Sequence, residues 1–115
     1  MSRYLISFND GDMTFPDEDF PAVAQAVRTL RAEAIEAGAW VFGAGFSDYA
    51  PRVVDSMGKI TVGPLQNGPV RLGGFSIIEV ATDAQANEWA RKIAIACRCS
   101  QEVRKFIDDS TSSSN

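Results

Sequence analysis

Few side chains in this sequence have the types and spacing that acid–base or nucleophilic chemistry needs. The chain contains no histidine, which removes the commonest general base and any pairing of histidine with a serine or cysteine nucleophile. The carboxylates that remain as weak candidates for a catalytic acid or base are Glu79, Asp48 and Asp55, with Tyr4 or Tyr49 as a proton donor. A carboxylate in this role needs a pKa raised by burial, and no pattern in the sequence demonstrates such burial.

Glu79 stands out because it lies near the end of an apolar run. In strict strand alternation it shares a face with Phe75 and Ile77, where a carboxylate is costly unless it is paired or lies at a wet rim. The cations that could pair with it are Arg3, Arg52 and Arg71. A salt-bridged or rim-exposed glutamate is the leading interpretation, and a carboxylate in a ligand pocket is the alternative.

The two cysteines, Cys97 and Cys99, are separated by one residue. A disulfide between them would close a strained ring, and a metal site would lack further ligands because there is no histidine and no other cysteine. We therefore expect free thiols, no metal and no cofactor.

Length and charge limit the classes of protein and partner. The chain has 115 residues, which fits one domain over residues 1–107 followed by a disordered polar tail over 108–115. Its net charge of −4 argues against nucleic acid as an obligate partner. No stretch has the length of a signal peptide or a bilayer span, so we expect a cytoplasmic protein that does not act at a membrane.

Local patterns predict the order of the elements. Residues 3–8 form a first strand, and an apolar stripe at helical spacing then predicts a helix that Asp17 or Asp19 caps and Gly38 ends. Residues 39–46 form a strand, 52–62 a hairpin with a glycine-containing turn, and the run after Gly73 and Gly74 a central strand. Thr82 with Gln85 is a capping box that opens a second helix, and residues 101–107 form the last strand.

This order predicts an α+β fold, a ferredoxin-like split βαβ sandwich with an antiparallel sheet, two helices on one face and an inserted hairpin and loop. Alternation places Trp40 and Phe42 on one face of their strand, while Gly43 and Gly45 on the other face allow close packing or, alternatively, a ligand. The sheet face without helices would expose aromatic residues, so we expect a homodimer joined sheet to sheet.

Aromatic and cationic residues near that face suggest a small-molecule pocket. Its expected lining comprises Tyr4, Trp40, Phe42 and Phe75, with Arg52 or Arg71 to orient an anionic or carbonyl group. Plain core or interface packing is the alternative for the aromatic residues.

Several short motifs, spread from Arg3 to about Phe106, resemble the YCII-related proteins, and in particular the branch named for an Asp-Gly-Pro-Phe motif. The matching stretches are Tyr4-Leu5-Ile6, Gly63-Pro64-Leu65, Leu72-Gly73-Gly74-Phe75, Ile78-Glu79-Val80, and residues 83–93 with Trp89. The resemblance implies a dimeric α+β barrel on the ferredoxin-like plan. It also implies a possible regulatory role, because some members are encoded beside or fused to extracytoplasmic-function sigma factors.

The chain departs from this family in its acidic loop. Val62, Asn67 and Val70 stand where the family has acidic residues, and Leu65 replaces the phenylalanine of the motif. A histidine–aspartate pair that distant members carry has no counterpart here. These departures favour a homodimer that binds a small organic molecule, with a carboxylate enzyme or a protein-interaction module as the alternatives.

Overall fold

A computed structural model describes residues 1–63 and 71–107 of the chain, so the predictions for the loop at 64–70 and the tail at 108–115 lie outside the described residues. The elements are β1 (Ser2–Asn9), a 3-10 turn (Asp17–Asp19), α1 (Phe20–Glu36), β2 (Trp40–Gly45), β3 (Arg52–Val54), β4 (Ile60–Val62), β5 (Leu72–Val80), α2 (Asp83–Cys97) and β6 (Glu102–Lys105). Each strand and helix predicted over these residues is present. Neither helix in this described part is long and apolar enough to cross a membrane.

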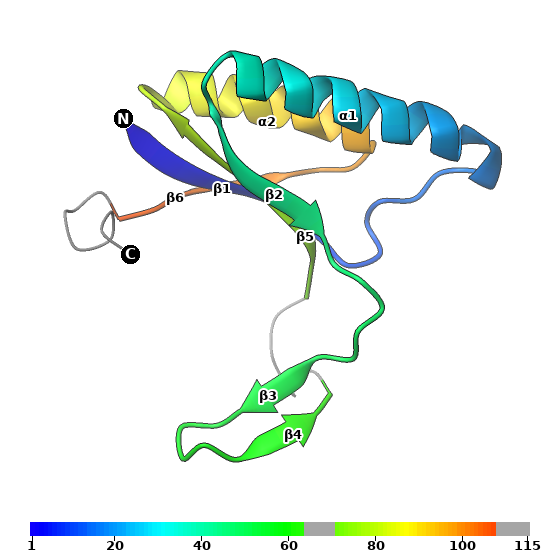
Figure 1. Ribbon diagram of the computed structural model, residues 1–115, viewed down its shortest axis with the longest axis vertical. Coiled ribbons are helices and arrows are strands. Elements are labelled where there is room, and N and C mark those ends of the chain that lie inside the picture. The colour runs from blue at the N-terminus through cyan, green and yellow to red at the C-terminus, as the bar shows by residue number, and fades with distance from the viewer. Residues whose placement is uncertain (64–70, 108–115) are drawn as a thin grey trace.

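The main sheet has the strand order β2-β5-β1-β6, and every neighbouring pair is antiparallel. Both helices lie on one face of this sheet, as Figure 1 shows. The order and the one-sided helix layer are those of the predicted ferredoxin-like α+β fold. The sheet is open, with β2 and β6 at its edges, so the described chain forms no closed barrel by itself.

The core lies between the helices and the two central strands. Ile6 on β1 and Ile78 on β5 are fully buried, because their strand positions face the helices. Ala86 and Ala90 of α2 pack in the same cluster, and Val23 of α1 is also buried. Small residues on α2 allow this helix to approach the sheet closely, which fixes the spacing of the two layers.

Capping explains where the helices begin and end. Thr82 Oγ1 accepts from the Gln85 amide at 3.1 Å, and Gln85 Oε1 accepts from the Thr82 amide at 3.1 Å, which is the predicted capping box. The predicted cap on α1 is wrong. Asp19 makes no side-chain cap hydrogen bond because it already has helical dihedrals at the end of the 3-10 turn, and its carboxylate pairs with Arg98 at 2.8 Å. Gly38 follows α1 with a φ of 74°, as predicted for a terminating glycine.

A β-bulge in β2 corrects the predicted faces of this strand. Trp40 pairs with Ile78 and Phe42 pairs with the next residue, Ile77, so Val41 is an extra residue on β2. Ile78 faces the helices and Ile77 faces away, so Trp40 and Phe42 lie on opposite faces of the sheet. The prediction that they share a face is therefore wrong.

Gly43 leaves the space that the indole of Trp40 fills. A Cβ at position 43 would lie 2.6 Å from the Trp40 Cη2 atom and 3.0 Å from the carbonyl oxygen of Phe75. The leading interpretation of the glycines in this strand was close packing with a helix or a second chain, whereas Gly43 packs against Trp40 of its own strand and lies on the same face as that residue. Gly45 differs, because a Cβ there would meet only one atom, at 4.0 Å.

The hairpin of β3 and β4, residues 52–62, stands away from the main sheet on the side opposite the helices (Figure 1). We call it the hairpin arm. The radius of gyration is 15.9 Å, whereas a compact chain of this length has about 13 Å. The arm therefore makes the molecule more extended than an ordinary domain of its size.

Candidate functional site

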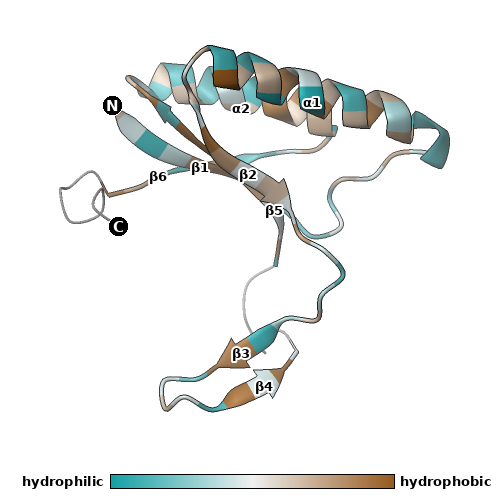
Figure 2. Ribbon diagram, viewed as in Figure 1, coloured by the Kyte–Doolittle hydropathy of each residue, from teal (hydrophilic) through white to brown (hydrophobic). Residues whose placement is uncertain are grey.

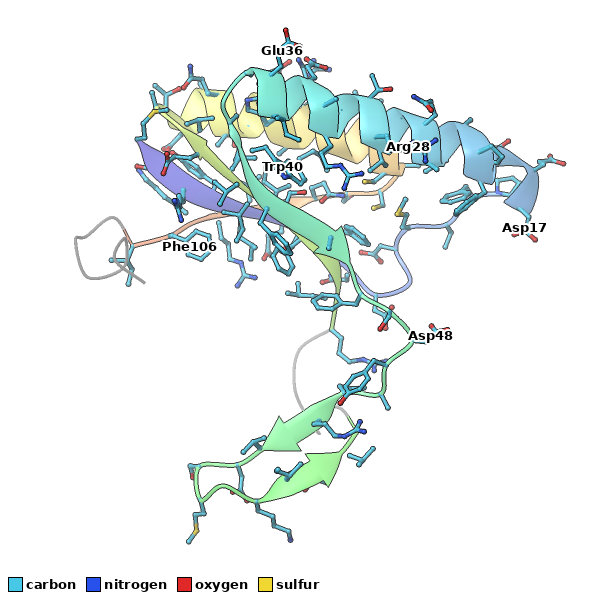
Figure 3. The ribbon with its side chains drawn as sticks, viewed as in Figure 1. Asp17, Arg28, Glu36, Trp40, Asp48 and Phe106 are labelled. Carbon is cyan, nitrogen blue, oxygen red and sulfur yellow. The ribbon has the colours of Figure 1, made fainter. Side chains whose placement is uncertain are left out.

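The sheet face opposite the helices, which we call the open face, carries an exposed aromatic cluster. Phe42 and Phe46 both contact Phe75, with ring centroids 6.1 and 6.0 Å apart, and the side chain of Phe42 is 55% exposed. Leu5 of β1 extends the cluster, because it pairs with Ile77 of β5 on the same face. Figure 3 shows Phe106 on this side of the sheet as well.

Glu79 also lies on the open face, and its carboxylate is paired. Arg3 Nε donates to Glu79 Oε2 at 3.0 Å, from the position directly opposite on β1. The two side chains are 53% and 38% exposed. Glu79 is therefore the salt-bridged, partly exposed glutamate of the leading interpretation.

The other two candidate carboxylates lie elsewhere. Asp55 Oδ1 accepts from the amides of Met57 and Lys59, each at 2.9 Å, and so fixes the turn of the hairpin arm. Asp48 lines a wide solvent-open groove at the base of the arm, together with Tyr49. The three carboxylates do not share a site, but Asp48 lies in one groove with Tyr49, a proton donor predicted for it, so the carboxylate enzyme stays a prediction.

The other two predicted cations, Arg52 and Arg71, are separated from Glu79. Arg71 lines the same groove and pairs with Asp10 at 3.5 Å. The guanidinium carbon of Arg52 lies 4.8 Å from the centre of the Tyr49 ring, and its Nη1 donates to the backbone carbonyl of Ala50. These contacts hold the base of the arm.

Tyr4 belongs to the core rather than to the open face. It is only 3% exposed, and its hydroxyl donates to Asp83 Oδ1 at 2.5 Å, while Lys105 Nζ lies 3.6 Å from the same oxygen. The Tyr4 hydroxyl, and next the charge of Lys105, lower the pKa of the Asp83 carboxyl. Tyr4 therefore joins β1 to the first turn of α2.

A cavity of about 310 Å³ lies between the helices and β2. Among the predicted ligand-binding residues, Trp40 and Phe75 line it, although the Phe75 ring also belongs to the open-face cluster; Tyr4, Phe42, Arg52 and Arg71 do not line it. The rest of its wall is mostly apolar and includes Phe8, Met13, Val27, Leu30, Ala34, Gly43, Trp89, Ile93 and Ala96. Both tryptophans of the chain are thus in this wall.

Four side chains give the cavity its polar groups: Ser76, Gln101, Cys97 and Arg31. Gln101 Nε2 lies 3.5 Å from the Cys99 carbonyl oxygen, and Arg31 on α1 is exposed with no ion pair to any residue that the structure describes. Burial, and next the nearby Cys99, raise the pKa of the Cys97 thiol to about 11. The Cys97 thiol is therefore neutral at pH 7 and a poor nucleophile.

Sequence patterns did not reveal most of this lining. Trp89, Leu30 and Ala96 lie on two helices, and they meet β2 only after the helices pack on the sheet. The one usable signal was Gly43 beside aromatic residues, which indicates close packing under a helix. Among residues 1–63 and 71–107, no group of three histidine, cysteine, aspartate or glutamate side chains could hold a metal ion.

Comparisons with known proteins add no family assignment. A scan against protein-family models finds no match for the chain, and a search of curated proteins finds no significant match either. The resemblance to YCII-related proteins therefore stays a prediction from the sequence.

Proposed function

We propose that the protein binds a small, largely apolar organic molecule in the cavity between the helices and β2. The observation that carries this proposal is the cavity itself, whose volume of about 310 Å³ falls at the lower end of the range for ligand pockets. It is about twice the roughly 150 Å³ of an engineered apolar cavity that binds benzene. A ligand of one or two fused rings fits that volume.

The character of the wall also favours a bound molecule. The wall is mostly apolar and the cavity opens to solvent, so an apolar ligand would remove apolar surface from water. The ligand would also gain dispersion contacts with the wall.

The polar groups indicate how such a ligand would be oriented. Ser76 and Gln101 can each form a hydrogen bond with a neutral group of the ligand. Arg31 lies on α1 and is exposed to solvent, so it can contact a polar or anionic substituent at the mouth. The body of the ligand must be uncharged, because the rest of the wall offers a charge no partner.

Tryptophan fluorescence tests the proposal directly, because both tryptophans line the cavity. Titration with naphthalene and with 2-naphthol should produce a saturable change in emission. Ala96→Leu places extra atoms in the cavity and should weaken this binding at least tenfold. Ala26→Leu, on the exposed side of the same helix layer, is the matched control and should leave binding unchanged.

The proposal fails if neither probe gives a saturable change with a folded protein. It also fails if Ala96→Leu and Ala26→Leu bind the probes equally well, since binding would then occur outside the cavity. Thermal unfolding with and without probe gives an independent measure, because a ligand that binds only the folded state raises the unfolding temperature.

We further propose that the protein is a homodimer joined through the open face. The support is the exposed cluster of Phe42, Phe46 and Phe75, which is the kind of apolar patch that marks an interaction surface. Sedimentation analysis over a range of concentrations tests it. Phe42→Glu should give a folded monomer, whereas Phe20→Glu, at an equally exposed phenylalanine on α1, should remain dimeric.

A further inference from the structure

The hairpin arm has an apolar face that nothing in the described chain covers. Alternation in the ladder places Val54, Ile60 and Val62 on one face, with Arg52 at its base, and Val53 and Thr61 on the other face. The first three side chains are 60%, 66% and 67% exposed. In Figure 2 parts of both strands of the arm are coloured as hydrophobic, although the arm lies far from the core.

The arm is also a two-stranded sheet on its own. Its ladder pairs only β3 with β4, and the hydrogen bonds at its base and turn stay within residues 49–63 of the described chain. An isolated two-stranded hairpin is marginally stable at best in water. The arm's apolar face therefore needs a packing partner, and none of the other residues in 1–63 and 71–107 supplies one.

The direction of the arm identifies that partner. It projects from the side of the sheet that carries the open face, away from both helices (Figure 1), and the molecule is 45 Å long in its longest dimension. A second sheet stacked on the open face would lie about 10 Å below the first. A copy of the chain in that position would lie beside the arm rather than beyond its reach.

The size of the open face points to the same partner. Four strands about 4.8 Å apart and about 20 Å long cover about 400 Å² of flat area on each copy, or about 800 Å² for a pair. Specific interfaces bury about 1,200–2,000 Å² in total. Side chains project from each sheet, so the buried area exceeds the flat area of the strands. The two arms add a further contact on each side of the two-fold axis.

We infer that each hairpin arm packs its Val54–Ile60–Val62 face against the second copy of the chain, so that two arms clasp the dimer. This inference rests on the proposed homodimer and adds the part of the interface that the sheet face lacks. Two of the arm's three charged residues, Arg52 and Asp55, are used in contacts at its base and turn, and the third, Lys59, lies in the turn outside the ladder. The apolar side chains are thus free for the interface.

The two faces of the arm provide a test by substitution of valine or isoleucine with threonine, which keeps the branch at Cβ and removes apolar character. The double variant Val54→Thr with Ile60→Thr should raise the dimer dissociation constant at least tenfold in sedimentation. Val53→Thr, on the opposite face, should change it by less than threefold. Circular dichroism should show an unchanged fold for all of them.

A photocrosslinking amino acid in place of Met57 tests the same inference by proximity. Met57 is at the tip of the arm and 93% exposed, so the substitution does not disturb packing within the chain. Illumination should join two copies of the chain, and the Phe42→Glu monomer should show no such product.

The outcomes separate the clasp from the dimer. If the wild type is dimeric but arm variants leave its dissociation constant unchanged and no crosslink forms between copies, the clasp is wrong and the dimer stands. If the wild type is monomeric at every concentration, both are overturned, and the arm's face would be left for a different protein.

Discussion

Gly73 and Gly74, which precede the central strand β5, allow a sharp test of how the fold is packed. A Cβ at Gly73 would lie 2.8 Å from Phe8 Cε2, 2.9 Å from the Asn9 carbonyl oxygen and 3.1 Å from its carbonyl carbon. Two of these three atoms belong to the backbone of β1, at the bulge between Phe8 and Asn9. Gly73→Ala therefore forces strands β1 and β5 apart instead of moving one flexible side chain.

The expected size follows from two opposing effects. Overpacking of this kind costs about 1–3 kcal/mol, and replacing glycine by alanine returns about 0.4–1 kcal/mol by restricting the unfolded chain. Gly73→Ala should therefore destabilise the fold by about 1–2 kcal/mol. Gly45→Ala is the matched control, because the nearest atom to its Cβ is 4.0 Å away, and it should stabilise by about 0.4–1 kcal/mol.

Urea unfolding followed by tryptophan fluorescence measures both variants. The protein concentration must be equal in all samples, because dimerisation would make stability depend on it. The midpoints should move in opposite directions with unchanged slopes, and the thermal midpoints should differ by several degrees, at about 4 °C per kcal/mol. If both variants shift in the same direction, the steric argument at Gly73 is wrong.

Four further predictions concern single side chains. Asp83→Asn should make the free energy of unfolding, measured with urea, depend less on pH below about pH 3.8. The lowered pKa of the Asp83 carboxyl stabilises the fold above its ordinary pKa, and this gain disappears as the pH falls through the lower pKa of the folded state. Tyr4→Phe should weaken the same pH dependence, since the Tyr4 hydroxyl is its largest cause. In peptide mapping after iodoacetamide treatment at pH 8, Cys97 should react more slowly than Cys99, and its rate should rise about tenfold per pH unit towards pH 11. Thr82→Ala should lower the free energy of unfolding by about 1 kcal/mol through loss of the capping box.

Local patterns were enough to predict the elements. The capping box at Thr82 and Gln85 and the terminating role of Gly38 are short-range chemistry, so a single sequence contains them. The strand order then follows from the succession of strands and helices, because short connections leave few topologies. The predicted α1 cap was wrong because it depends on a long-range contact: Asp19 pairs with Arg98, which is far away in the sequence.

The candidate site was less predictable because it depends on tertiary contacts. Strict alternation put Trp40 beside Phe42, and nothing in the residues of β2 marks Val41 as the extra one. The cavity wall requires knowledge of how α1 and α2 lie over that strand, which places Leu30 and Trp89 opposite it. Tyr4 was expected in a pocket, whereas its hydroxyl is used by the second helix.

The bulge at Val41 gives strand β2 two separate tasks. Without it, Trp40 and Phe42 would lie on the same face of the sheet, and either the core would lose its indole or the open face would lose its phenylalanine. With it, Trp40 enters the cavity wall above Gly43, while Phe42 joins Phe75 on the open face. The proposed ligand cavity and the proposed dimer interface are thus the two faces of one strand. A single extra residue allows both to be apolar, although alternation alone would assign the aromatic side chains to only one of them.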